Sequence, residues 1–244
     1  MKTRKLIILG IILTFSLNLY AQVNLGKIKV PKSVTKEIPG STTAASESEI
    51  ASGLKEALTI GANKASSELN QVDGYNKNTK VRIPFPEDAQ KVAKTLRDMG
   101  FGSKVDEFEL TLNRAAEQAA KEAAPIFVSA IKEMTISDAK NILTGPDTAA
   151  TGYLRKTTYN PLYDSFSPHI ANALNSTQAT QKWTEITTIY NKFSKNKVET
   201  DLVKYTTNKA LKGLFILVAE EELKIRKDPL ARTTDLLKKV FGSN

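Results

Sequence analysis

Apolar residues recur at intervals of three and four along most of this chain, and no stretch alternates apolar and polar residues for more than a few positions. The first spacing places apolar side chains on one face of an α-helix, whereas a half-buried strand needs strict alternation. With 244 residues and 41% hydrophobic content, the chain is long enough to bury a substantial core. The sequence therefore predicts an all-α fold, a single multi-helix bundle-like domain.

The N-terminal segment has the pattern of a secretory signal peptide. Basic residues at Met1–Lys5 precede the apolar run Leu6–Leu17, and the small residue Ala21 marks the expected cleavage point. An uncleaved membrane anchor is the alternative, because the apolar segment is only slightly shorter than the roughly 20 residues that a spanning helix prefers. We expect a signal peptide at residues 1–21 and export to the periplasm.

Residues 22–46 contain Pro31, the Pro39-Gly40 pair and a run of Ser and Thr, without an apolar period long enough to pack. This composition favours a flexible tether. The helical domain is expected to occupy residues 47–242. No transmembrane span is expected there, because the longest block that is apolar all round, Leu214–Ala219, is far too short.

The chain has no cysteine, which excludes disulfides, thiol catalysis, thiolate metal sites and a lipoprotein anchor. It has one histidine, His169, so a zinc site would need carboxylate ligands almost exclusively. His169 follows a proline at an expected helix start, and we expect a surface or helix-cap role for it. The sequence predicts no metal and no cofactor.

The net charge of the whole chain is +9, and the mature part carries +6, because the leader contributes three basic residues and no acidic ones. This excess would favour an anionic small molecule or an envelope component such as lipid headgroups or glycans. Nucleic acid is not expected as a partner of an exported protein. A solvated surface that leans basic accounts for the excess more simply.

Two capping boxes locate helix starts: Ser46 with Glu49, and Thr135 with Asp138. Pro125 is expected to kink or break the chain between two helical segments. The remaining expected starts are near Ser103, capped with Asp106, and near Asp147, which is itself the expected cap. The expected helices are Ser46 to about Leu69, Glu87–Met99, Asp106–Ala124, Ile126–Met134, Thr135–Leu143, one carrying Tyr153–Arg155, Pro168–Leu174, Gln178–Phe193, Glu199–Lys227 and a last segment ending at Phe241-Gly242.

Ionisable groups lie on or beside apolar ridges of these helices, most densely within Leu112–Thr158. Such groups are rarely buried without partners, so they either join elements of the core or form a polar pocket. Glu221 lies on an apolar ridge and needs an arginine or lysine from another element, and the candidate arginines are Arg114, Arg155 and Arg226. Glu222 with Arg226 has the spacing of a solvated pair. The speculative ligand-binding residues are Arg114, Glu117, Asp138, Arg155, Glu221 and Arg226, with the arginines as donors to an anionic ligand.

Three classes of function fit this pattern. The favoured one is a non-enzymatic binding protein, or a structural protein, of the cell envelope. The alternative is a hydrolase that works through Glu117, Asp138 and Glu221, which would need an acid whose pKa burial raises. No phosphate loop, nucleophile elbow, HExxH motif or calcium loop is present, so we assign no catalytic residue.

Aromatic residues could stack on a sugar or another ring, and the candidates are Trp183, Tyr153, Tyr159 and Tyr163. Single aromatics at helical spacing are more often part of the core or an interface. We therefore expect packing roles for them.

Several blocks, in the same order, resemble the bacterial DUF4197 family of unknown function. The resemblance covers roughly Gly53–Phe241 and is weakest over Thr180–Thr200. It implies an exported, mainly helical bacterial protein with no established activity, catalytic residues or cofactor. The blocks are Val81–Pro86, Leu112–Glu117, Ala130–Ala139, Ile142–Gly145, Ala150–Arg155, Gly213–Phe215 and Ile225–Arg226.

Overall fold

The computed structural model describes residues 46–193, 195, 197–199, 201–228, 230, 232 and 234–241, so the predicted leader and nearly all of the predicted tether lie outside the described residues. Over the described ranges the chain forms helices and turns and no strand, which confirms the all-α prediction. The α-helices are α1 (Glu47–Leu69), α2 (Gln90–Asp98), α3 (Gly102–Ala119), α4 (Ala123–Glu133), α5 (Ile136–Leu143), α6 (Ala149–Ser176), α7 (Ala179–Phe193), α8 (Leu202–Lys227) and α9 (Asp235–Phe241).

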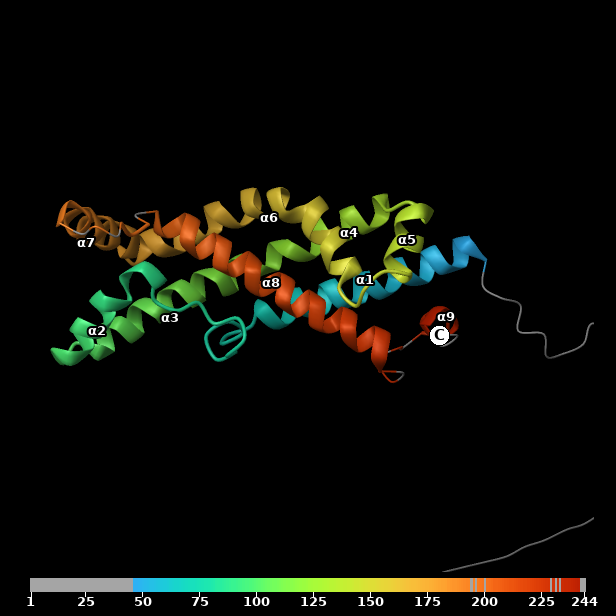
Figure 1. Ribbon diagram of the computed structural model, residues 1–244, viewed down its shortest axis with the longest axis horizontal. Helices are drawn as coiled ribbons and strands as arrows, with labels where there is room; N and C mark the ends of the chain where they lie inside the picture. The colour runs from blue at the N-terminus through green and yellow to red at the C-terminus, as the bar shows by residue number, and fades with distance from the viewer. Residues whose placement is uncertain are drawn as a thin grey trace, which may run out of the picture. The chain divides into compact units, whose positions relative to one another are not determined.

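Helix α8 is the central helix of the domain. It contacts α1, α3, α6 and α7, and its closest association is with α6; Figure 1 shows it crossing the other long helices. Four of the six residues of its apolar block, Leu214, Phe215, Leu217 and Val218, are buried, and the other two are partly buried. In the part of the chain described here, no helix is both long and apolar enough to cross a membrane.

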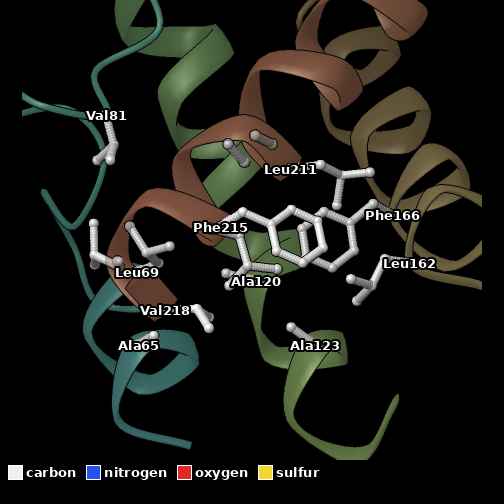
Figure 2. Packing of buried hydrophobic residues seen from close by; sticks show 14 of the residues in the cluster. Ala65, Leu69, Val81, Ala120, Ala123, Leu162, Phe166, Leu211, Phe215 and Val218 are labelled. Atoms are coloured by element: carbon white, nitrogen blue, oxygen red, sulfur yellow. The ribbon is translucent and has the colours of Figure 1, made fainter. Parts of the chain in front are cut away.

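The core lies where α1, α3, α4, α6 and α8 meet (Figure 2). Phe127 of α4 and Phe215 of α8 pack edge to face, with 5.9 Å between ring centroids. Three alanines are fully buried where α3 passes into α4: Ala116 in the last turn of α3, Ala120 in the turn between the helices and Ala123 at the start of α4. Their small side chains let the neighbouring helices approach closely, so the core here is packed by close helix contact as well as by large side chains.

Pro125 does not break the helix at its own position, contrary to the prediction. The interruption is a 3₁₀ turn at Ala120–Glu122, and α4 begins at Ala123. Pro125 therefore lies in the first turn of α4, where backbone N–H groups have no partner within the helix. The missing N–H of proline costs little at this position, which explains why the break lies before it.

Helix α6 runs without interruption from Ala149 to Ser176, with Pro161 and Pro168 inside it. The prediction of a separate helix at Pro168–Leu174 is wrong. An internal proline costs a helix about 3 kcal/mol. Five side chains that the structure buries completely lie along α6 and offset this cost, because each contributes about 1.5–3 kcal/mol; they are Leu154, Leu162, Phe166, Ile170 and Leu174.

Local capping signals predicted some helix starts correctly and others wrongly. The capping boxes at Ser46 and Thr135 are both present. The prediction that Asp106 caps α3 is wrong: α3 begins at Gly102 without a side-chain cap, and Asp106 pairs with Arg97 at 2.7 Å. Asp147 likewise does not cap α6 and instead pairs with Lys227 at 2.6 Å.

Candidate functional site

Residues 73–86, which we call the strap, connect α1 to the turn before α2 and lie against one face of α3. Three polar residues of α3 at intervals of four, Glu109, Asn113 and Glu117, face it; we call them the α3 ladder. All three are buried. The interval of four places them in one row along the helix, so a single helix face can bind successive backbone groups of an irregular segment.

Asn113 is the centre of the α3 ladder. Its side-chain oxygen accepts a hydrogen bond from the Ile83 N–H at 2.8 Å, and its amide nitrogen donates to the Ile83 carbonyl at 2.8 Å and to the Glu109 carbonyl at 2.7 Å. Glu109 accepts from the Phe85 N–H at 3.0 Å and pairs with Arg82 at 2.6 Å. The two side chains therefore satisfy backbone groups of the strap that no helix or sheet would satisfy.

Glu117 binds the start of the strap. One oxygen accepts from the N–H groups of Tyr75 and Asn76, both at 3.1 Å, and the other pairs with Arg114 at 2.6 Å. Arg114 also reaches Asp73 at 2.8 Å. Hydrogen bonds from Lys77, Asn76 and Arg114 hold the pKa of Asp73 well below its usual range. Arg114 thus links two carboxylates, and its guanidinium pKa is raised by its bond to Glu117.

Glu222 and Arg226, which we call the α8 clamp, hold both ends of the connection between α5 and α6. Glu222 accepts from the N–H groups of Ala150 and Thr151, at 3.0 and 2.8 Å, in the first turn of α6. Arg226 donates to the Ile142 carbonyl at 2.8 Å in the last turn of α5 and pairs with Glu222 at 3.0 Å. The pair is buried, with side-chain exposures of 12% and 4% for Arg226 and Glu222, so the prediction of a solvated pair is wrong.

Glu221 is buried and binds Lys64 of α1 at 2.9 Å and Lys224 at 2.5 Å. A basic partner from another element was predicted and is confirmed, although it is Lys64 and not one of the candidate arginines. Burial alone would raise the pKa of Glu221, but the hydrogen bonds from Lys224 and Lys64 outweigh it and the pKa is lowered.

The six speculative ligand-binding residues therefore have separate partners. Arg114 and Glu117 form a pair, but Asp138 caps α5 and the Arg155 guanidinium lies 4.9 Å from the ring centroid of Phe215. The pKa of Asp138 is lowered by its bonds to Thr135. Glu109 and Glu222 were not among the predicted site residues, yet they also bind backbone N–H groups and an arginine. These contacts favour a structural network over a shared anion site.

The downward pKa shifts of Asp73, Asp138 and Glu221 give the hydrolase alternative no support, because a general acid needs a raised pKa. His169 is 41% exposed and lies within α6, 3.4 Å from Glu122. Over the described residues no group of three or more acids or histidines is placed to hold a metal ion.

A hollow among the described residues, which we call the pocket, lies between α2, the first half of α3 and α7. It encloses about 390 Å³, a size typical of small-molecule sites. Helices α2 and α7 and the start of α3 lie at one end of the helical domain in Figure 1. The lining residues are Phe85, Val92, Leu96, Lys104, Val105, Glu107, Phe108, Thr111, Thr177, Ala179, Lys182 and Trp183.

Three aromatic rings form one wall of the pocket. Phe108 and Trp183 stack with 5.5 Å between centroids, and Phe85 lies 5.1 Å from Phe108 and 5.5 Å from Trp183. Glu109 helps to place Phe85, because it binds the Phe85 N–H. The α3 ladder and the pocket wall are therefore joined through the end of the strap.

A family model described as "Protein of unknown function (DUF4197)" matches residues 44–242, most of the chain. The chain belongs to the DUF4197 family. The resemblance seen in the sequence blocks is thereby confirmed, and the helical domain described here is the domain of this DUF4197 protein. No curated protein and no solved structure matches it.

Proposed function

We propose that this DUF4197 protein is an exported, non-enzymatic binding protein of the cell envelope that holds a ligand with an apolar body in the pocket. The observation that carries the proposal is the pocket itself, with a wall of three packed aromatic rings and a mainly apolar lining. The buried acids of the domain bind backbone N–H groups or cations of the fold, which supports a structural role for the charged network.

Ligand binding is tested with a neutral fluorescent probe, 1-N-phenylnaphthylamine, added to the purified protein. We expect saturable probe emission and a matching change in the emission of Trp183, the only tryptophan of the chain. Leu96→Phe should reduce the affinity roughly tenfold, because it fills space at a partly buried lining position. Leu110→Phe, on an exposed position of α3 outside the lining, is the matched control and should bind as the wild type does.

Two results would contradict binding in the pocket. One is the absence of saturable probe binding by the wild type. The other is equal affinity for the Leu96→Phe and Leu110→Phe variants, which would place the probe elsewhere on the protein.

The export part of the proposal rests on the basic and apolar pattern of residues 1–21. Expression of the complete chain in a Gram-negative host, followed by osmotic shock, should release a protein whose intact mass corresponds to a start at Gln22. Recovery of the uncleaved chain from the cytosolic fraction would argue against export, and recovery of the uncleaved chain from membranes would favour the anchor alternative.

A further inference from the structure

The polar side chains that line the pocket are, with one exception, engaged by the protein. The Thr111 hydroxyl donates to the Glu107 carbonyl at 3.0 Å, and the Thr177 hydroxyl donates to the Leu174 carbonyl at 2.9 Å. The indole N–H of Trp183 donates to the Glu199 carbonyl at 3.0 Å. A ligand inside the pocket would therefore contact aromatic rings and methyl groups. The lining has few free hydrogen-bonding groups that could recognise a polar ligand.

Two lysines and one acid line the pocket as well. Lys104 pairs with Glu107 at 2.8 Å, and both side chains are mainly exposed. Lys182 is exposed, and across the described residues its ammonium has neither a hydrogen bond nor an ion pair. An exposed side chain on a pocket lining lies at the opening, where a lysine stem can cover apolar surface while its charge stays near water. The opening therefore has a net positive charge and one cation free to bind.

We propose that the pocket binds a single-tailed anionic amphiphile, such as a fatty acid. Its tail would lie against Phe85, Phe108 and Trp183, and its anionic head would pair with Lys182. This inference rests on the proposed function, because it names the chemistry of the ligand that the pocket would hold. Charge complementarity decides between head groups: a cationic head would meet the like charge of Lys182, and a neutral head would leave that ammonium without a partner.

The inference is tested by displacement of the neutral probe with three amphiphiles that share one tail: laurate, dodecanol and dodecyltrimethylammonium, each below its micelle concentration. We expect laurate to displace the probe at roughly tenfold lower concentration than the other two. Added salt should reduce this advantage, because Lys182 is exposed and its interactions are screened.

Two charge-matched variants locate the head group. Lys182→Gln should remove the advantage of laurate over dodecanol, both compared within this variant. Lys156→Gln loses the same charge at an exposed position of α6 outside the pocket lining, and it should keep the advantage. Thermal unfolding by circular dichroism checks that both variants are folded.

The possible failures are distinguishable. Equal displacement by all three amphiphiles would overturn the anionic ligand while the proposed binding function stands. A laurate advantage that survives in Lys182→Gln and disappears in Lys104→Gln would overturn the role of Lys182. A wild-type protein that binds neither the probe nor any amphiphile would overturn the proposed function itself.

Discussion

Helix α3 has two regions that differ in how their polar groups are satisfied. From Glu109 onward, Glu109, Asn113 and Glu117 bind backbone groups of the strap and are buried. In its first half, Val105 and Phe108 line a pocket whose uncovered surface is mainly aromatic and aliphatic. Polar groups that are fully paired within the fold support structure, whereas surface left without a partner is available to a ligand. This difference supports the proposal that the charged network stabilises the fold and that the pocket binds a ligand.

The most direct test of the stabilising role of the charged network is to remove Glu222, the acid of the α8 clamp. Glu222→Ala leaves the Ala150 and Thr151 N–H groups without a partner and removes the acidic partner of the largely buried Arg226, which keeps only its bonds to carbonyl groups. We expect the free energy of unfolding, measured with urea, to fall by about 3–5 kcal/mol. Glu220→Ala is the control on the same helix: it removes a partly exposed pair with Lys80 and should cost less than about 1 kcal/mol. Equal losses in the two variants would contradict the structural role of the clamp.

Removal of the central amide of the α3 ladder should have the next largest effect. Asn113→Ala leaves the Ile83 N–H and carbonyl unpaired in a buried position. We expect a loss of about 2 kcal/mol in the free energy of unfolding. Asn175→Ala, at an exposed position near the end of α6, should be nearly neutral. If Asn113→Ala is as stable as the wild type, water can replace the Asn113 amide as the hydrogen-bond partner of the Ile83 N–H and carbonyl.

A smaller effect, and one that depends on pH, is expected at Glu221. Its folded-state pKa is lowered from an ordinary value of 4.5, so the charged form contributes stability above that value, and the contribution is lost as the pH falls through the lowered pKa. Glu221→Gln should lose about 1 kcal/mol at pH 7 and less at pH 3. Urea unfolding at both pH values measures the difference.

A variant in which Lys64 and Lys224 are both changed to methionine should reproduce the loss at pH 7, because these lysines lower the pKa of Glu221. A loss in Glu221→Gln that is the same at both pH values would show that the carboxylate acts through its shape and not through its charge.

Several features encoded within one helical turn were predictable from the sequence, whereas the hydrogen bonds that join distant segments were not. The capping box of Thr135 and Asp138 lies within four residues, and both the cap and the helix were predicted. The cap of α6 comes from Glu222, more than 70 residues along the chain, so no local pattern could indicate it. The nearer acid, Asp147, was the reasonable choice and was wrong.

The pocket could not be predicted for the same reason. Its wall joins Phe85 of the strap, Phe108 of α3 and Trp183 of α7, which are brought together only by the packing of the whole domain. Trp183 was predicted to have a packing role, and its contacts with the two phenylalanines confirm it. The α3 ladder was easier to predict than the pocket, because the interval of four from Glu109 to Asn113 to Glu117 is visible in the sequence. Of these three residues, only Glu117 was predicted to belong to the candidate site. The strap has no helical pattern, so the sequence did not indicate that its backbone needs Glu109 and Asn113 as partners.

The smallest expected effect on stability is at Lys182, and it separates the pocket from the charged network most directly. Its ammonium has no acidic partner among the described residues, so Lys182→Gln should change the free energy of unfolding by less than about 0.5 kcal/mol. Urea unfolding of this variant and of Glu222→Ala compares the stability contribution of a residue proposed to bind the ligand with that of a residue that stabilises the fold. A loss in Lys182→Gln comparable to that in Glu222→Ala would mean that the lysine belongs to the structural network, and the distinction between the two regions would no longer hold.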